Sequence, residues 1–560
     1  MTWRALWLLA LIPPPENPSP IVTAIFPPGA SLGSTETWTI SGRNLGRADS
    51  IWVSEGEGLT FGAVRIAPSG RSASVEVRVA AGAKPGFREV RVDGPDGISN
   101  LAIVRVDPLP QVVEVEPNDK VPAPSQIIRV GTAVAGTIRP LDVDRFRVEG
   151  EPGRQVSVDW ETRRLGTSII PVLTITGPGR SAIAQARMSP GGDRDCRTSV
   201  VIPAEGWFEV ELRDNTYGGD DRARYRLRVD PAPRVPRDFT HPPRINELSE
   251  PIDQPPGQPW PVAVGPGGVT ILGKIGQGGE VDRFRVEAKA GDRFRARVEA
   301  SAVGSPLDSV LTVLGPRGES LGENDDRKPD ASIVPPSTVD GSATTDSTLD
   351  LEIKEDGPIT VELADRFGFG GPEFAYRLEL GPPRDDFAVY LIAGLTSSDP
   401  AIDARVLANS DATDPSLFVP GRFGAFNLKP GTTTPFHFVV VPRGRPGSIE
   451  VRAEGLPAGV TSEPVVVRLA NAPRSKGKAE IPFDAPPVLD SLRLRAADAG
   501  PIRGSFRVVA RRRVPAGSNA EATQHEASAV VGVDAAGGPG RPVIRPLTTL
   551  PIRVVGPPRE

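Results

Sequence analysis

The seven-residue stretch VDRFRVE occurs twice in this chain, at residues 143–149 and again at 281–287. Each copy follows a glycine-containing apolar stretch and precedes an aromatic strand that contains Tyr225 or Tyr376. The two stretches are 138 residues apart, whereas the two tyrosines are 151 residues apart. The second copy therefore carries about 13 additional residues, which we place in the polar loop 323–347. A repeat of this length predicts a duplicated domain, because solenoid repeats span only about 20–50 residues.

Short stretches of alternating apolar and polar residues cover most of the chain, such as SASVEVRVA at 72–80 and ITVELAD at 359–365. This alternation is typical of strands with one buried and one wet face, as in antiparallel sandwiches. A chain of 560 residues has room for about four domains. The sequence therefore predicts an all-β fold of tandem antiparallel β-sandwich or jelly-roll-like domains. Pro-rich linkers should join them at 231–243, 252–261 and 381–386.

Charge, cysteine and histidine content exclude several classes of protein. The 65 basic and 70 acidic residues nearly balance. The sequence has no basic stripe interleaved with aromatic residues, the pattern that would indicate nucleic-acid binding. Cys196 is the only cysteine, so the chain has no internal disulfide. None of the three histidines has a partner at metal-ligand spacing. Short matches to catalytic motifs occur, but the flanking sequence does not predict the secondary structure that these motifs require. We therefore predict a protein that is not an enzyme and has no catalytic residues.

The N-terminus begins with a short basic and then apolar segment. Arg4 is followed by eight apolar residues at 5–12, fewer than the roughly 20 that span a bilayer. This pattern predicts a signal peptide at 1–18 and a secreted, periplasmic or cell-surface location. The alternatives are a frayed apolar tail or a misplaced start. No later segment is apolar enough to span a membrane.

The ordered motifs of the repeat resemble the bacterial pre-peptidase C-terminal (PPC) domain. The first copy has EPND at 116–119, GTI, DVDRF, PVLTI, EGWFEVEL and a closing Gly-Gly…Tyr. The second has EVDRF at 280–284, SPLDSVLTVLGPRGESLGENDD, EDGPITVEL and Gly-Gly…Tyr. This resemblance covers about 270 residues and implies PPC-like domains at 109–232 and 243–381.

The flanking regions resemble immunoglobulin-like domains. PSPIVTAIFPPGASLGSTETWTISGRNL and GPDGISNLAIVRV are similar to an IPT/TIG domain and place it at 19–108. The region 386–560 is similar to an immunoglobulin-like module found beside PPC domains in large secreted bacterial proteins. The stretches that show this resemblance are VPRGRPGSIEVRAEGLPAGVT and LRLRAADAGPIRGSFRVVA.

The stretch VVEVEPND at 112–119, here called the acidic segment, gathers oxygen-bearing side chains. In a strand, Glu114, Glu116 and Asn118 share one face and Asp119 follows at the turn. Carboxylates on one face repel each other unless a cation neutralises them, and Ca²⁺ takes six to eight oxygen ligands. The sequence therefore predicts a calcium site here. The alternative is a solvated acidic edge strand that discourages aggregation.

Two further acids, Asp142 and Asp144, open the VDRFRVE strand and would complete the site if the acidic segment crosses the start of that strand. The resemblance supports this, because PPC-like collagen-binding modules of bacterial collagenases bind Ca²⁺ through a similar Glu-x-Glu-x-Asn-Asp segment. The second copy keeps Glu247 and Glu250 but lacks Asn-Asp, which puts a second site in doubt.

Together these features predict an exported, non-catalytic, multi-domain protein that binds or adheres outside the cell, with Ca²⁺ stabilising the first PPC-like domain. The expected partner is an extracellular protein or polysaccharide. The resemblance adds a secreted protease as a partner, since such modules accompany peptidases. Alternatives are an accessory or C-terminal portion of a secreted peptidase system, a structural envelope component, and a hydrolase with an unrecognised site.

Overall fold

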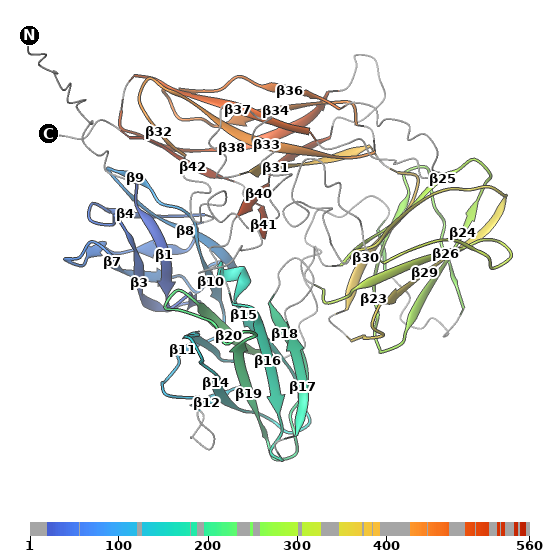
Figure 1. Ribbon diagram of the computed structural model, residues 1–560, viewed down its shortest axis with the longest axis horizontal. Coiled ribbons are helices and arrows are strands. Elements are labelled where there is room, and N and C mark those ends of the chain that lie inside the picture. The colour runs from blue at the N-terminus through green and yellow to red at the C-terminus, as the bar shows by residue number, and fades with distance from the viewer. Residues whose placement is uncertain are drawn as a thin grey trace, which may run out of the picture.

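The computed structural model confirms the all-β fold class that the alternating sequence predicts. Strands form eight sheets, which follow one another along the chain as four pairs that we call sandwiches 1 to 4 (Figure 1). Among the described residues, the only helical element is the 3-10 turn η1 (Arg163–Leu165). No helix in this part of the chain is long and apolar enough to cross a membrane.

The structure describes residues 19–555 apart from the following: 55, 120–125, 168, 180, 188–194, 232–246, 250–257, 301–304, 326–345, 372–373, 384, 393–425, 445, 470–487, 499, 514–522, 527, 532–542 and 547–548. The predicted signal peptide at 1–18 lies outside the described residues, as do most of the polar loop 323–347 and most of the linkers at 231–243 and 252–261.

Sandwich 1 consists of the sheets β1-β3-β7-β5, with β6 beside β7, and β2-β10-β8-β4, with β9 beside β8. Its strands are β1 (Ile21–Phe26), β2 (Gly29–Ser31), β3 (Thr35–Arg43), β4 (Ser50–Val53), β5 (Leu59–Phe61), β6 (Arg65–Ile66), β7 (Ser72–Val79), β8 (Gly86–Gly94), β9 (Gly97–Ile98) and β10 (Ala102–Asp107). Sandwich 4 consists of the sheets β35-β37-β33-β31-β40-β41 and β32-β42-β38-β34-β36, with β39 beside β38. Its strands are β31 (Asp386–Ile392), β32 (Phe426–Leu428), β33 (Thr433–Arg443), β34 (Ser448–Glu454), β35 (Val460–Thr461), β36 (Val465–Arg468), β37 (Val488–Ala496), β38 (Ile502–Arg513), β39 (Gln524–Glu526), β40 (Ser528–Val531), β41 (Val543–Pro546) and β42 (Leu550–Val554).

Sandwiches 2 and 3 have the same strand order. The sheets β11-β13-β20-β15-β18 and β12-β14-β19-β16-β17 of sandwich 2 correspond to β21-β23-β30-β25-β28 and β22-β24-β29-β26-β27 of sandwich 3. Sandwich 2 has the strands β11 (Gln111–Val113), β12 (Gln126–Arg129), β13 (Ala133–Thr137), β14 (Asp144–Glu149), β15 (Gln155–Glu161), β16 (Pro171–Thr176), β17 (Ala182–Arg187), β18 (Cys196–Val201), β19 (Trp207–Asp214) and β20 (Arg224–Asp230). Sandwich 3 has the strands β21 (Glu247–Ser249), β22 (Trp260–Pro261), β23 (Val269–Lys274), β24 (Val281–Ala288), β25 (Arg293–Glu299), β26 (Ser309–Leu314), β27 (Ser320–Asn324), β28 (Thr348–Glu352), β29 (Gly357–Asp365) and β30 (Ala375–Gly381).

The VDRFRVE strands show why the sequence folds in this way. Along β14, Phe146 and Val148 are buried in the core between the two sheets, while Arg145 and Arg147 lie nearer the surface. β24 repeats this alternation, with Phe284 and Val286 in the core of sandwich 3. The interior strand pairs of sandwiches 2 and 3 are antiparallel, as predicted, whereas in sandwich 4 the interior pair β31–β40 is parallel. The first strand of each sheet, however, pairs in parallel in sandwiches 2 and 3.

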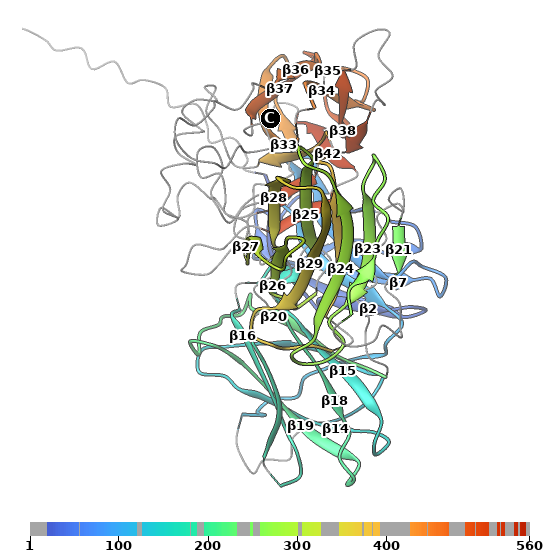
Figure 2. The same cartoon turned by 90° about the vertical axis from the view of Figure 1, so that its right-hand side faces the viewer.

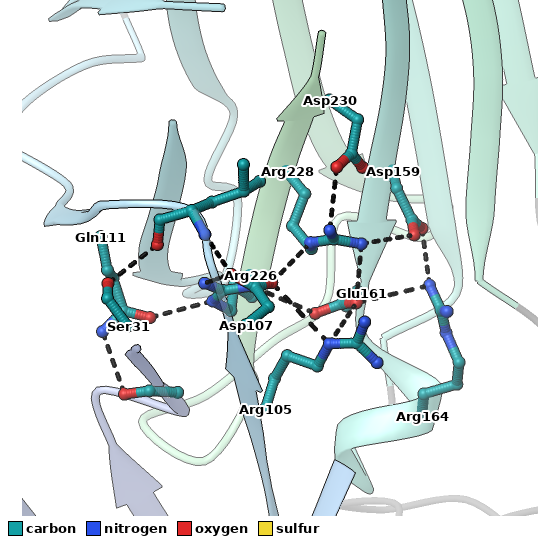
Figure 3. A network of polar contacts seen from close by, with 12 residues as sticks. Ser31, Arg105, Asp107, Gln111, Asp159, Glu161, Arg164, Arg226, Arg228 and Asp230 are labelled. Atoms are coloured by element: carbon teal, nitrogen blue, oxygen red, sulfur yellow. Dashed lines mark hydrogen bonds and ion pairs between the residues drawn. The ribbon is translucent and has the colours of Figure 1, made fainter. Parts of the chain in front are cut away.

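Sandwich 1 packs against sandwich 2 through buried charged side chains (Figure 3). Asp107 at the end of β10 accepts a hydrogen bond from Arg226 at 3.0 Å and lies 2.8 Å from Arg228 Nε. Glu161 of β15 is also fully buried, 3.7–3.8 Å from the guanidinium groups of the same two arginines. Burial of single charges would be costly, so the alternation of signs is what allows this contact to form.

Sandwich 4 returns to sandwich 1, so the first and last sandwiches of the chain lie side by side (Figure 1). Arg553 of β42 donates to both oxygens of Asp93, with Nε at 2.9 and 3.0 Å and Nη2 at 2.6 Å. The side-chain amide of Asn427 pairs with the backbone N–H and C=O of Ile98 at 2.9 and 2.8 Å. In the turned view, sandwich 3 lies in front of sandwich 1 (Figure 2).

Candidate metal centre

The acidic segment continues the line of β11 and turns the carboxylate of Glu114 inward. The backbone N–H of Glu114 donates to the carbonyl oxygen of Ala135 on β13 at 3.0 Å, which extends the parallel pairing by one residue. Val113 and Val115, on either side of Glu114, are 48% and 63% exposed. The segment therefore reverses the usual pattern at Glu114, which is half-buried while the flanking valines face solvent; Glu116 is exposed.

Glu114 is held by two hydrogen bonds to the neighbouring strands. Its Oε1 accepts from the backbone N–H of Thr137 at 2.8 Å, and its Oε2 accepts from the hydroxyl group of Tyr225 at 2.8 Å. A side chain at Gly136 would meet this arrangement directly, since its Cβ would lie 2.2 Å from Glu114 Oε2. Only glycine at this position lets the carboxylate lie flat against β13.

Asp144 brings a second inward carboxylate from the start of β14. It is fully buried, and neither of its oxygens makes a hydrogen bond of ordinary geometry within the described part of the chain. Carboxylate oxygens of Glu114, Glu116 and Asp144 all lie within 4.8 Å of one another. This is the only group of three or more potential acidic, histidine or cysteine ligands among the described residues.

Asn118 adds a buried amide to the same segment. Its backbone N–H donates to Glu116 Oε2 at 2.9 Å. Its side chain is only 2% exposed, yet neither Oδ1 nor Nδ2 has a hydrogen-bond partner among the described residues. A buried amide without partners is costly, so this position calls for a further group that the carbonyl oxygen can bind.

The other two predicted ligands lie outside the close group. Asp142 accepts a hydrogen bond at 3.0 Å from the backbone N–H of Arg139, so its carboxylate closes the turn that precedes β14. Asp119 is exposed, and its backbone carbonyl oxygen accepts a hydrogen bond from Arg145. The structure thus brings together three of the six predicted ligands, places Asn118 beside them, and gives Asp142 and Asp119 neighbouring positions.

Electrostatics favour positive charge at this cluster. Burial and the nearby charge of Glu114 raise the pKa of Asp144 to about 9, and burial raises the pKa of Glu114 to about 7. Burial and the charge of Asp142 also raise the pKa of Glu116. Without a cation the site therefore retains protons, and a bound cation could take their place.

The residues present fit a hard divalent cation. The close group offers three carboxylates, the acidic segment adds the amide of Asn118, and neither brings sulfur or imidazole. Oxygen donors of this kind are what Ca²⁺ prefers. Tyr225 and Gly136 belong to the same site but were absent from the sequence prediction. The available signal was that each copy of the repeat contains a glycine before the VDRFRVE strand and a tyrosine in its closing strand.

Sandwich 3 retains only part of this arrangement. Asp282 occupies the position of Asp144, and the hydroxyl group of Tyr376 donates to it at 2.7 Å. In the parallel pairing Glu247 lies opposite Thr270, so it stands in the place of Gln111 rather than Glu114. By the same offset Glu250, outside the described residues, would correspond to Glu114, and an isoleucine would replace Glu116.

Comparisons with known proteins give distant structural matches. The chain is similar to the pre-peptidase C-terminal domain of collagenase from Bacillus anthracis, with 11% identity over 20% of this chain and 99% of that one, at a TM-score of 0.17. It is also similar to SGBP-B of the Bacteroides ovatus mixed-linkage glucan utilization locus, in complex with a mixed-linkage heptasaccharide. That match has 8% identity over 38% of this chain and 76% of that one, at a TM-score of 0.14. A third match, with 9% identity, is trypsin-activated alpha-2-macroglobulin from Escherichia coli, over 90% of this chain and 31% of that one, at a TM-score of 0.14.

Sequence comparisons gave no match, either to a protein-family model or to a curated protein. The role of the chain therefore has to be argued from its own residues.

Proposed function

We propose that this chain is an exported, non-catalytic binding protein whose sandwich 2 is stabilised by Ca²⁺ at the inward carboxylate cluster. The observation that carries the proposal is the convergence of Glu114, Glu116 and Asp144 beside the unpartnered side chain of Asn118. A cation there would take the place of the protons that these three carboxyl groups otherwise retain, of which that of Asp144 is fully buried.

Calcium would act on the structure of sandwich 2 rather than on a reaction. Glu114 and Glu116 belong to the acidic segment and Asp144 belongs to β14, so a shared cation would fasten the segment to the body of the sandwich. Tyr225 and Thr137 hold Glu114 in position from β20 and β13. The four-sandwich chain would then present its outer surfaces to a protein or polysaccharide outside the cell.

The location and the binding role rest on separate supports. The apolar leader at 1–18 suggests export. The resemblance of the repeat to PPC domains suggests an environment of secreted proteins, including proteases. A chain of four β-sandwiches in which no catalytic motif is recognised is better suited to binding than to enzymatic catalysis.

Calorimetry and thermal melts of the full chain test the calcium site. Extracellular modules bind Ca²⁺ near about 10⁻⁴–10⁻³ M, so about 2 mM Ca²⁺ should stabilise sandwich 2 by about 1–2 kcal/mol relative to EDTA. Asp144→Asn should abolish both the binding heat and the thermal shift. Asp282→Asn, at the equivalent position of sandwich 3, is the matched control and should leave both intact. Absence of a binding heat with wild-type protein at millimolar Ca²⁺ would remove the cation from the proposal.

The binding role has its own test. Full-length protein should be retained on insoluble polysaccharides or on extracellular protein fibres, and it should release no product from them. Steady release of product by the purified chain would contradict the non-catalytic assignment.

A further inference from the structure

Three loops meet at one end of sandwich 2 and carry exposed apolar side chains. The backbone N–H of Leu141 donates to the carbonyl oxygen of Tyr217 at 2.9 Å, and that of Asn215 donates to the carbonyl oxygen of Ile170 at 2.8 Å. Leu141, Ile170 and Tyr217, here called the apical patch, are 79%, 38% and 44% exposed. The patch is distinct from the carboxylate cluster, although Leu141 adjoins Asp142.

Two residues of the apical patch have an unfavourable backbone conformation. Leu141 has a φ of 67° and Tyr217 a φ of 54°, which places both in the left-handed region. Bulky residues rarely adopt this conformation, because Cβ approaches the neighbouring carbonyl oxygen. Strain of this kind persists where a side chain serves a purpose that the fold alone does not require.

Sandwich 3 shows that the loop geometry does not need these side chains. There the hydrogen bond equivalent to Leu141–Tyr217 runs from the N–H of Gly279 to the carbonyl oxygen of Gly368 at 3.1 Å. Both glycines have the same left-handed backbone, with φ values of 77° and 71°. Glycine is the ordinary choice for this conformation.

The third position of the patch follows the same rule. Arg366 N–H donates to the carbonyl oxygen of Asp308 at 2.7 Å, as Asn215 does to that of Ile170. Asp308 therefore stands where sandwich 2 has Ile170. The same backbone is built in sandwich 3 from two glycines and an aspartate, so the leucine, isoleucine and tyrosine of sandwich 2 are not required for folding.

The tip of sandwich 3 is also apolar, but through other positions. Asp365 accepts hydrogen bonds from the backbone N–H groups of Phe367 and Phe369 at 3.0 and 2.8 Å. Asp214 does the same for Thr216 and Gly218 in sandwich 2. Phe367 and Phe369 are 66% and 62% exposed. Two equivalent loops thus carry large exposed apolar side chains at different sequence positions.

We propose that the apical patch inserts into the interfacial layer of a lipid bilayer with zwitterionic headgroups. Leu141 is 79% exposed, as an inserting side chain must be. Tyrosine suits the boundary between headgroups and acyl chains, and the guanidinium of Arg213 lies 4.8 Å from the ring centre of Tyr217, where it can reach a phosphate.

The charges around the patch determine the headgroup class. Arg139 lies 3.9 Å from Glu116 and 3.4 Å from Asp221, so one cation stands between two acids. Asp221 is 84% exposed. Arg213 is a second cation beside the patch, so these four charges balance. The patch is therefore compatible with a neutral surface and has no net attraction to an anionic one. A protein partner with an apolar pocket, or a second copy of this chain, are the other occupants that the experiment distinguishes.

Vesicle sedimentation with the full chain tests the proposal. Extruded phosphatidylcholine vesicles should bind wild-type protein in EDTA as well as in Ca²⁺, and replacing half of the lipid by phosphatidylglycerol should not strengthen binding in EDTA. Leu141→Gly/Tyr217→Gly, which copies sandwich 3, should lower the partition coefficient by about tenfold. Its melting temperature should rise slightly, because glycine relieves the strain. Ile183→Ser/Val201→Ser removes two exposed apolar side chains elsewhere on sandwich 2 and is the matched control.

A label at the patch provides a second measurement. Cys196 is buried, so Leu141→Cys can be labelled selectively with an environment-sensitive dye, and its emission should shift to shorter wavelength when vesicles are added. No sedimentation and no shift would overturn the proposal. A wild-type dimer that Leu141→Gly/Tyr217→Gly dissociates, without vesicle binding, would also overturn it and assign the patch to contact between copies. Both results are independent of the calcium measurements.

Discussion

Sandwiches 2 and 3 share one framework but differ in what is built on it. Their strand orders are identical, and Gly136 opposite Tyr225 matches Gly273 opposite Tyr376. They differ at the inward carboxylate cluster, at the apical loops and on the outer face of one sheet. The comparison teaches that alternating apolar positions specify the sandwich, whereas single charged and bulky residues account for the differences between the two copies.

The outer face gives the clearest of these differences. On the sheet that meets sandwich 1, Asp159 lies opposite Arg228. At the equivalent place in sandwich 3, Arg297 lies opposite Glu379, so the two charges are exchanged. Asp107 of sandwich 1 requires a cation at position 228, and sandwich 3 would offer a carboxylate there. The exchange therefore allows sandwich 1 to dock on only one of the two copies.

The largest expected effect comes from removing the charge at the centre of this contact. Asp107→Ala would leave Arg226 and Arg228 buried with fewer partners, at a cost of about 3–5 kcal/mol. Differential scanning calorimetry should show a lower first transition. Asp220→Ala, which removes Asp220 from its pair with the partly exposed Arg222, is the control and should cost no more than about 1 kcal/mol. Equal losses from the two variants would show that the buried network contributes no more than a surface pair.

The charge exchange can be imposed directly. Asp159→Arg/Arg228→Glu gives sandwich 2 the pair found in sandwich 3 and places a carboxylate beside Asp107. The two sandwiches should then separate, and small-angle scattering should report a larger radius of gyration. An unchanged radius would indicate that apolar contacts alone hold the joint.

The strands were predictable because their alternation is local information. β14 and β24 show this, since the VDRFRVE pattern by itself places Phe146 and Phe284 in the core. The network around Asp107 was not predictable. RYRLRV reads as an alternating strand with a solvated basic face, and only the packing of sandwich 1 on that face buries Arg226 and Arg228. Contacts between distant segments leave no periodic signal in the sequence.

The candidate site was predictable in part, for a related reason. Side chains alternate with a period of two along a strand, which indicated that Glu114, Glu116 and Asn118 share a face. That these residues lie close to Asp144 was predicted only by supposing that the acidic segment crosses the start of β14. The register between paired strands cannot be read from the sequence, so the positions of Tyr225 and Gly136 beside Glu114 could not be predicted. The sequence also could not separate Asp142, whose carboxylate closes a turn, from the close group.

A smaller effect is expected from pH, and it distinguishes the two copies. Folding raises the pKa of Glu114 to about 7 and that of Asp144 to about 9, mainly through burial. Both groups ionise near pH 4 in the unfolded chain, so their contribution favours the folded state below that pH. It is lost as the pH rises through about 7 and about 9. In EDTA, the melting temperature of sandwich 2 should therefore fall by several degrees between about pH 5 and pH 9.

Matched variants show whether this pH dependence belongs to the cluster. Asp144→Asn removes one of the two titrating groups and should flatten the profile, whereas Asp282→Asn should leave the part due to sandwich 2 unchanged. Calcium should reduce the fall, because a cation favours the ionised carboxylates. A profile that Asp144→Asn does not alter would show that other groups dominate.

The smallest expected effect reverses the comparison at the apical loops. Gly279→Leu/Gly368→Tyr gives sandwich 3 the side chains of Leu141 and Tyr217. An added Cβ at either glycine meets no atom within 4 Å, so the only cost is the left-handed backbone, about 1 kcal/mol per position. The melting temperature of sandwich 3 should fall slightly, while Leu141→Gly/Tyr217→Gly raises that of sandwich 2 by a similar amount. If neither changes, the left-handed loops carry no strain, and the side chains of sandwich 2 would need no functional reason to be there.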